Sequence, residues 1–276
     1  MSSHETLQVS WQAWRALATR PAVMALQETL HELPADRWPT HADWTLAARA
    51  RGTRNLRGQA LSFVAPSHPP PSALDFEQRI HDRAEVETRS ACWHDAFHAC
   101  AWLAFPLAKA RINALHVAHG ADASPNLRGV VRNVLTLLDE GGLLVVSRHP
   151  QLLDLVRGFR WHALFWERRA AVRESMDFTI LGHALHERTL TMEYGATGRA
   201  LLFAGDETYF AAGIAARLRW LDAQVAALLD DPARLAATTA LQPLPINGIP
   251  GWNAANELEA YYFDQRQFSP GRRRAA

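Results

Sequence analysis

The sequence predicts an α+β fold that is predominantly α-helical, with a few short strands, in a single compact domain with an irregular C-terminal segment. Apolar residues recur at helical spacing along most of the chain, whereas the runs typical of strands are only a few residues long. No internal repeat is visible. A chain of 276 residues that is 48% hydrophobic and 21% charged can bury a sizeable core.

The N-terminal region, residues 1–64, is expected to pack as helices on the main body. Apolar residues from 9 to 30 follow a helical period around Pro21, and residues 61–64 are typical of a short strand. The proline-rich stretch APSHPPPS, residues 65–72, is the best candidate for a boundary. The main domain is therefore predicted to span residues 65–276.

The first half of this main domain is predicted to consist of helices. A short helix is expected over residues 75–82 and a long apolar helix over 89–105, where Pro106 either ends it or begins another helix over 107–116. A helix over 126–138 should stop at DEGG, because Gly141 and Gly142 suit a helix C-terminus.

The second half alternates short strands with helices. LLVVS, MDFTIL and ALLFAG are typical of buried strands, and GHALHERTL should form a helix after the second of these. Residues 152–167 are predicted to be helical with a break at Gly158, and residues 209–229 to form one long helix. The tail after residue 240 is rich in Pro and Gly and is expected to be irregular.

The bulk properties exclude several classes. A formal net charge of +1 gives no global electrostatic attraction to nucleic acid or membranes. No stretch is long and apolar enough to span a membrane, and the N-terminus does not resemble a signal peptide, so we expect a cytoplasmic protein. Cys92 and Cys100 lie about 12 Å apart along one predicted helix, too far for a disulfide.

Common catalytic motifs are missing from the sequence. It contains no G-x-G-x-x-G, no Walker loop, no G-x-S-x-G and no C-x-x-C. His186 and Glu187 begin like the helix of a zinc peptidase, but Leu190 stands where the second histidine should be.

The apolar helix ACWHDAFHACAWLAFP carries the first candidate site. His94 and His98 are four residues apart and Asp95 is three from His98, so all three are expected on one helix face. Two imidazoles at this spacing can direct a nitrogen at one metal ion. The alternative is a structural hydrogen-bond network or a partly exposed helix face.

Two further stretches carry ionisable residues. In GHALHE, His183 and Glu187 are four residues apart at the start of a helix that follows a strand, or else belong to an ordinary amphipathic helix. Asp139 and Glu140 lie unfavourably at a helix C-terminus, which suggests a compensating arginine or metal ion, although an exposed turn is the simpler interpretation.

These residues together predict a nitrogen and oxygen site for Zn²⁺, Mn²⁺ or Fe²⁺. Its ligands would be His94, Asp95, His98, His183 and Glu187. The order of His81, His94, Asp95 and Asp139 also matches that of an HD-type phosphohydrolase, although a single His-Asp pair arises easily by chance.

Two other regions could bind ligands. Four arginines, Arg49, Arg51, Arg54 and Arg57, could contact phosphate or RNA, although a solvated loop explains them more simply at this net charge. In NGIPGWN, Trp252 could wall a pocket, or the turn could only anchor the C-terminus.

Six stretches occur in the order FEQRI, CWHDAFHACAWLAFPLAKARIN, LTLLDEGG, FW, GHALHE and GIPGW. This order resembles that of DUF3025, a proteobacterial family with a domain of unknown function. The resemblance covers roughly residues 65–270 and implies no established activity. In that family the position of His98 is usually Asn, so this chain departs there. The resemblance therefore favours His94, Asp95, His183 and Glu187 over the pair of His94 and His98.

We therefore expect a buried polar pocket between the helices over 90–105 and 182–190, suited to metal-assisted hydrolysis of a small-molecule substrate. His94, Asp95 and Glu187 would be catalytic, while Arg79, Arg89 and Trp252 would contact the substrate. The alternative is a non-catalytic module that binds nucleic acid or a protein partner, in which the His/Asp cluster is structural.

Overall fold

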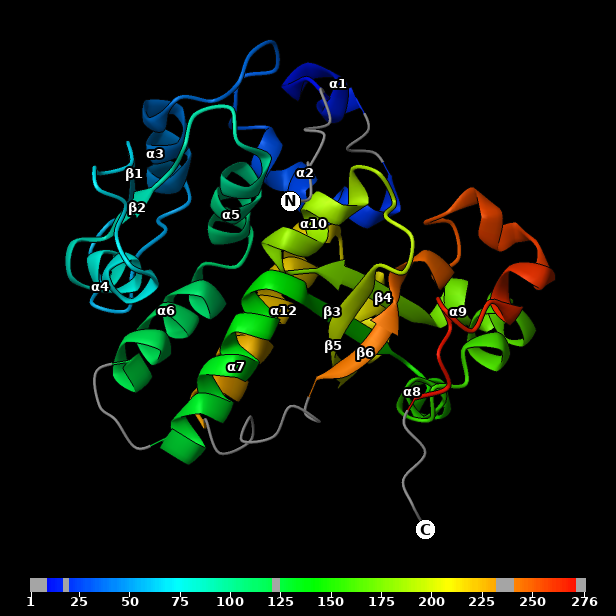
Figure 1. Cartoon of the computed structure of the whole chain (residues 1–276). Coiled ribbons are helices and arrows are strands. Elements are labelled where there is room, and N and C mark those ends of the chain that lie inside the picture. The colour runs from blue at the N-terminus through cyan, green and yellow to red at the C-terminus, as the bar shows by residue number, and fades with distance from the viewer. Residues whose placement is uncertain (1–8, 17–19, 121–124, 232–240, 272–276) are drawn as a thin grey trace.

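A four-stranded mixed sheet lies inside the larger part of the fold (Figure 1). The computed structural model describes residues 9–16, 20–120, 125–231 and 241–271. In it, β3 (Gly142–Ser147) pairs antiparallel with β4 (Met176–Ile180) and parallel with β5 (Thr197–Ala204). β6 (Gln242–Pro245) pairs antiparallel with β5. The order is β4-β3-β5-β6, so β4 and β6 are the edge strands.

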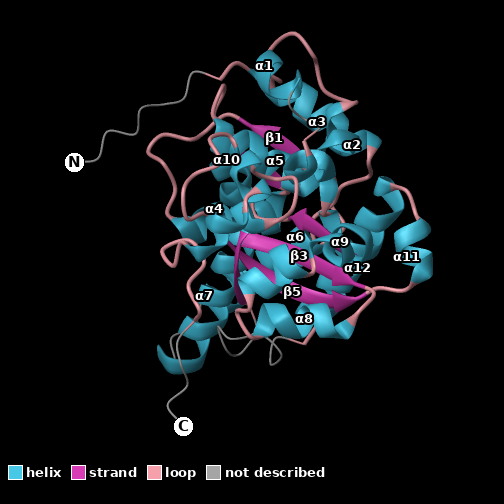
Figure 2. Cartoon of the chain, turned by 90° about the vertical axis from the view of Figure 1, so that its right-hand side faces the viewer, coloured by secondary structure: helices cyan, strands magenta, loops and turns pink. Residues whose placement is uncertain are grey.

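Helices cover both faces of this sheet (Figure 2). Side chains alternate along a strand, and every residue of β3 is buried. Leu144 and Val146 pack into one apolar cluster with residues of α5 (Trp93–Ala104), α6 (Pro106–Gly120), α7 (Pro125–Gly141) and α12 (Ile214–Leu229). Leu143 and Val145 pack into a second cluster with residues of α8 (Pro150–Arg157), the π-helical segment Ala163–Glu167 and α9 (Arg169–Ser175).

The N-terminal part packs on α5 through aromatic side chains. It contains α1 (Trp11–Ala16), the 3₁₀ turn η1 (Pro21–Val23), α2 (Met24–Leu30) and α3 (His41–Ala50). The ring of Trp11 stacks on that of Trp93 with centroids 5.9 Å apart, and Trp38 lies 4.6 Å from Trp93.

A small sheet connects this part with the rest of the chain. β1 (Ser62–Val64) pairs in parallel with β2 (Glu85–Glu87), and α4 (Ala73–Arg83) lies between them in sequence. The proline-rich stretch leads from β1 to α4. The division into residues 1–64 and 65–276 stays a prediction.

The predicted α+β class with dominant helices and short strands is confirmed. Individual boundaries differ. The helix expected over 209–229 is two helices, α11 (Glu207–Ala211) and α12, because Gly213 takes an extended conformation and begins α12. The helix expected from residue 89 begins only at Trp93. Both cysteines are free.

The remaining elements complete the chain. α10 (His183–Thr189) follows β4, and 3₁₀ turns at Ile246–Gly248, Ala254–Glu257 and Glu259–Phe263 make up the irregular C-terminal segment after β6. The helix α3 and the strands β2 and β6 were not expected from the sequence. None of the helices in the described part of the chain has the length and apolarity needed to cross a membrane.

Candidate functional site

Three segments meet beside the sheet: the first two turns of α5, the last turn of α7 and the first turn of α10 (Figure 1). Gly182 allows this close approach. A Cβ atom at Gly182 would lie 2.4 Å from the backbone nitrogen of Gly142 and 2.5 Å from the carbonyl oxygen of Glu140, closer than any side chain permits. The start of α10 can therefore touch the end of α7.

Two histidines and a carboxylate converge at this junction. The Nε2 atom of His183 lies 3.1 Å from Nε2 of His94 and 3.3 Å from Oε2 of Glu140. The two imidazoles meet edge to face, with centroids 4.6 Å apart. One ligand atom from each of the three residues lies within 4.8 Å of the others. We call His94, His183 and Glu140 the outer triad.

Each imidazole of the outer triad has a second carboxylate behind it. Nδ1 of His94 lies 3.2 Å from Oε2 of Glu187, and Nδ1 of His183 lies 3.8 Å from Oδ2 of Asp139. Both Nε2 atoms therefore point toward the shared space, while both Nδ1 atoms face an acidic group. A carboxylate that accepts a hydrogen bond from the second ring nitrogen orients a ligating imidazole and makes it more basic, and of the two contacts only that of His94 with Glu187 is within hydrogen-bond distance.

A second group lies deeper, around the other edge of the His183 ring. His98, Asp139 and His183 also offer ligand atoms within 4.8 Å of one another. Asp139 forms an ion pair with Lys109, the sole lysine of the chain, which is only 2% exposed. This positive charge holds the pKa of Asp139 well below its usual range, although burial opposes the shift. The inner carboxylate is thus already neutralised by a fixed cation.

The two histidines of the outer triad differ in their proton affinity. Burial lowers the pKa of His183 to about 4. The hydrogen bond to Glu187 raises the pKa of His94, although burial opposes it. A hydrogen bond between two Nε2 atoms 3.1 Å apart needs a proton on one of them, and the opposite shifts in pKa give His94 the higher proton affinity of the two.

A cavity of about 160 Å³ borders this junction. Asp139 and Glu140 lie at its wall together with Glu77 of α4 and Arg132 of α7. Burial and the charge of Asp139 raise the pKa of Glu77 to about 7. Arg132 and Glu140 are two turns apart on one face of α7, and no partner of the Arg132 guanidinium is found among the described residues.

Sequence reasoning did not select Glu77, Arg132 or Glu140 as site residues. The turn expected at Asp139 and Glu140 is wrong because both residues belong to α7, where Asp139 is buried and the side chain of Glu140 is 44% exposed. The signals that could have found these residues are the motif FEQRI, which contains Glu77, and the spacing of four that joins Arg132, Thr136 and Glu140.

Of the residues predicted as metal ligands, His94, His98, His183 and Glu187 come together and Asp95 does not. Asp95 accepts hydrogen bonds from the backbone N–H of Arg89 at 2.6 Å and from its guanidinium at 2.8 and 3.0 Å. The expectation that Asp95 shares the face of the two histidines fails because Asp95 folds back over the start of α5. This contact also engages Arg89, one of the predicted substrate contacts.

The other predicted contacts lie elsewhere. Arg79 forms ion pairs with Glu85 and Glu87. Trp252 lines a different cavity, beside β4, and His81 belongs to neither group of ligand atoms. The HD-type order therefore has no counterpart in the geometry.

The predicted arginine cluster is largely engaged within the chain. Arg51 pairs with Glu32 and Arg57 with Asp82, while Arg54 donates to the carbonyl of Gly58. Arg49 is exposed at the end of α3. Nucleic-acid binding through Arg49, Arg51, Arg54 and Arg57 stays a prediction.

Comparison with known proteins places the chain in one family. No curated protein and no solved structure matches it. A family model described as "Protein of unknown function (DUF3025)" matches residues 61–272, which include every residue of the outer triad and of the adjoining cavity. The chain therefore belongs to the family DUF3025.

Proposed function

We propose that the chain binds one divalent transition-metal ion through the outer triad and uses it to hydrolyse a small-molecule substrate. The spacing of the ligand atoms carries this proposal. Bonds of about 2.0–2.1 Å in a tetrahedral zinc site hold neighbouring ligand atoms roughly 3.3 Å apart. His183 Nε2 lies 3.1 Å from His94 Nε2 and 3.3 Å from Glu140 Oε2.

The donor set supports the same assignment. Two imidazoles and one carboxylate hold catalytic zinc in several hydrolases and leave a fourth position for water, and a related set holds Fe²⁺. Glu187 and Asp139 supply the supporting carboxylates behind His94 and His183. Mn²⁺ is compatible with the same ligands. Lys109 neutralises Asp139, which favours a supporting role for this carboxylate over direct ligation.

Binding of the ion would replace the proton shared by the two imidazoles. Because the hydrogen bond to Glu187 raises the pKa of His94, the ion would compete with a proton for the Nε2 atom of His94. The fixed acidic groups remain and balance the charge of the ion.

The cavity beside the triad supplies groups for the reaction. A bound ion would lower the pKa of a coordinated water and make it a nucleophile near neutral pH. Glu77, with a pKa of about 7, suits the exchange of a proton with water or a leaving group. Arg132 lies at the same cavity, has no partner among the described residues and suits an anionic part of the substrate.

Zinc titration against a competing chelator tests the metal site. His94→Ala, His183→Ala and Glu140→Gln should each weaken binding by at least about a hundredfold, because each removes one direct ligand. Asp95→Asn is the matched control, since Asp95 lies on the same helix but contacts Arg89. Equal affinity in all four variants would refute the outer triad as the site.

Turnover tests the reaction separately. The zinc-loaded protein is assayed on a panel of ester, amide and phosphate-ester substrates, with Glu77→Gln beside the native chain. We expect Glu77→Gln to keep the metal and lose most of the rate. If the chain binds no metal and the triad variants are only less stable, the cluster is structural and the chain is a binding module.

A further inference from the structure

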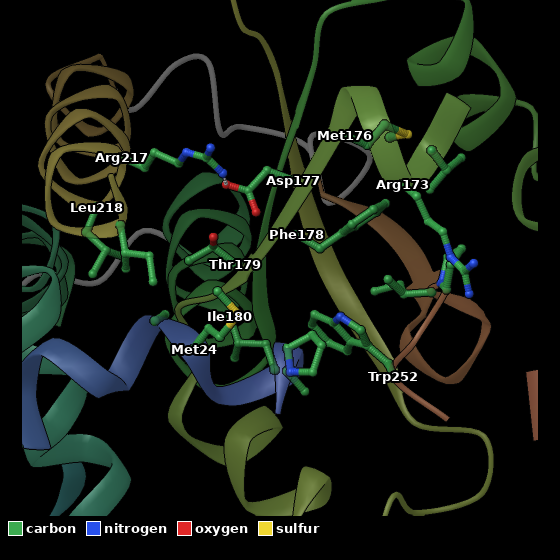
Figure 3. Close-up of a pocket in the computed structure, with 17 residues that line it drawn as sticks. Met24, Arg173, Met176, Asp177, Phe178, Thr179, Ile180, Arg217, Leu218 and Trp252 are labelled. Atoms are coloured by element: carbon green, nitrogen blue, oxygen red, sulfur yellow. Dashed lines mark ion pairs between the residues drawn. The ribbon is translucent and has the colours of Figure 1, made fainter. Parts of the chain in front are cut away.

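A second cavity, of about 210 Å³, lies along β4 and shares no lining residue with the cavity at α7 (Figure 3). All five residues of β4, from Met176 to Ile180, line it. Successive side chains of a strand point to opposite faces, so a cavity that touches every residue must run along the edge of the strand. β4 is an edge strand, and this cavity is at its open side.

The pairing of β4 with β3 shows which backbone groups face the cavity. The N–H of Arg148 donates to the carbonyl of Ser175, and the N–H of Leu181 donates to that of Gly142. Backbone bonds alternate along an antiparallel pair, so the odd-numbered residues of β4 bond to β3. The N–H and C=O groups of Met176, Phe178 and Ile180 therefore point to the open edge.

Two of these three residues have partners inside the chain. The N–H of Met176 donates to the carbonyl of Val172, and the carbonyl of Ile180 accepts a hydrogen bond from Nε2 of His186 at 3.2 Å. Phe178 differs from both. Among the described residues, neither its N–H nor its C=O has a recorded partner. Phe178 is thus the one residue of the three whose donor and acceptor are both without a partner among the described residues.

The walls beside this edge are apolar. Met24 of α2, Leu218 of α12 and the buried ring of Trp252 surround it with Ile180 (Figure 3). The volume is below the range of roughly 300–1,000 Å³ that is usual for drug-sized ligands. The space therefore suits a ligand of two or three residues with an apolar side chain.

The two guanidinium groups at the cavity are not equivalent (Figure 3). Arg217 donates to the carbonyls of Ala212 and Phe210 and faces Asp177 at 3.7 Å, so most of its donors are used. Arg173 is exposed, and its one recorded partner among the described residues is Glu257 at 3.1 Å. Arg173 precedes β4 by three residues, at the Met176 end of the edge.

We propose that this cavity binds a short peptide of two or three residues, added as an antiparallel strand to the free backbone groups of Phe178. One ligand residue exchanges both of its backbone hydrogen bonds with Phe178, and its apolar side chain enters the space between Met24 and Trp252. An antiparallel ligand runs from the Ile180 end toward the Met176 end. Its C-terminal carboxylate therefore points to Arg173.

Calorimetric titration of the full chain with four tripeptides tests this site. The peptides are Gly-Ala-Ala, Gly-Leu-Ala, Gly-Met-Ala and Gly-Phe-Ala. We expect saturable binding of at least one of the peptides with an apolar central residue larger than Ala. Methylation of the central nitrogen removes the bond to the Phe178 carbonyl and should weaken that peptide about fivefold to tenfold. Amidation of its C-terminus should weaken it by at least tenfold. These comparisons use the native protein and do not depend on any variant folding.

Variants test the protein side of the same contacts. Phe178→Pro removes the outward N–H, which an edge strand tolerates, whereas Phe178→Ala keeps it. We expect Phe178→Pro to weaken binding by at least fivefold relative to Phe178→Ala. Arg173→Gln should weaken the free acid but not the amide, and Arg219→Gln, a change of an exposed arginine on α12, should weaken neither.

Two results would overturn the proposal. The first is no binding of any of these peptides at about 10 mM, a concentration that detects even millimolar affinity. The second is binding that ignores both N-methylation and C-terminal amidation, because a ligand held by apolar contact alone would not need the strand edge.

Discussion

Replacement of Glu77 by Gln tests the ionisation that the structure assigns to the cavity beside the outer triad. Burial, and then the charge of Asp139, raises the pKa of Glu77 from 4.5 to about 7. A change of this size corresponds to roughly 3 kcal/mol between the protonated and ionised forms in the folded state. Asn113 donates a hydrogen bond to the Glu77 carboxyl at 2.7 Å, and the amide oxygen of Gln can accept the same bond.

The sign follows from the two pKa values. Below about pH 4.5 the carboxyl is protonated in both the folded and the unfolded chain, and its ionisation costs no stability. As the pH rises to about 7 the unfolded chain loses this proton more readily, so the native protein becomes less stable, and above pH 7 the loss is complete. Gln cannot ionise. Glu77→Gln should therefore gain up to about 3 kcal/mol over the native chain at pH 8 and little at pH 4.5.

Urea unfolding at both pH values, with a chelator present to remove metals, measures this difference. Glu174→Gln is the control, because Glu174 is an exposed residue of α9 whose replacement should change stability little at either pH. The same free-energy difference between Glu77→Gln and the native chain at pH 4.5 and pH 8 would refute the reasoning. It would mean that Glu77 is as hydrated as an ordinary surface carboxylate.

Three further changes have defined outcomes. Gly182→Ala should abolish cooperative thermal unfolding or lower its midpoint sharply, because the new Cβ would lie 2.4 Å from a backbone atom. In the control Gly213→Ala the new Cβ meets nothing within 4 Å, so stability should change by less than about 1 kcal/mol. Equal effects of the two changes would contradict the close approach at α10. Lys109→Met should lower the free energy of unfolding in urea by about 3–5 kcal/mol, because it leaves Asp139 buried without its cation. Adding Asp139→Leu should restore much of that loss. A Lys109→Met variant as stable as the native chain would disprove the burial of the pair. Glu187→Gln should weaken zinc binding by about 10–100-fold in calorimetry, while the number of metal ions bound per chain stays the same. Unchanged affinity would contradict the contact of Glu187 with the Nδ1 atom of His94.

Local patterns predicted much of the fold. Leu143 to Val146 form a continuous apolar run that indicates a strand buried on both faces, and β3 is such a strand. The break at Gly158 also follows from the sequence, because the helix over 152–167 ends and restarts around it. These features depend on residues near one another in the chain, where periodicity carries the information.

The end of α7 could not be predicted in the same way. The glycine pair after Glu140 suggested a turn, but α7 runs through Gly141 and β3 begins at Gly142 without a loop. A Cβ at Gly142 would lie 2.3 Å from the carbonyl oxygen of Leu138, so the glycine serves this tight transition. The position of Glu140 at the site depends on where α10 packs, which local sequence does not encode.

The candidate site was predicted in part for the same reason. His94 and His98 share a helix face, and His183 with Glu187 share another, as the spacing of four indicates. Spacing could not show that Asp95 would turn to Arg89 or that Lys109 would neutralise Asp139. The pair of Lys109 and Asp139 joins two helices, and the contact of Asp95 with Arg89 depends on the non-helical chain that enters α5, so helical spacing describes neither.

The metal content of the untagged protein tests most directly the central claim that the outer triad binds one divalent ion. It is measured by mass spectrometry after incubation with Zn²⁺, Mn²⁺ or Fe²⁺ and removal of excess ion. We predict close to one ion per chain in the native protein and in Asp95→Asn, and almost none in His183→Ala. His183 is decisive because its Nε2 atom faces both other members of the outer triad. No bound ion in the native protein, or the same content in His183→Ala, would contradict the account.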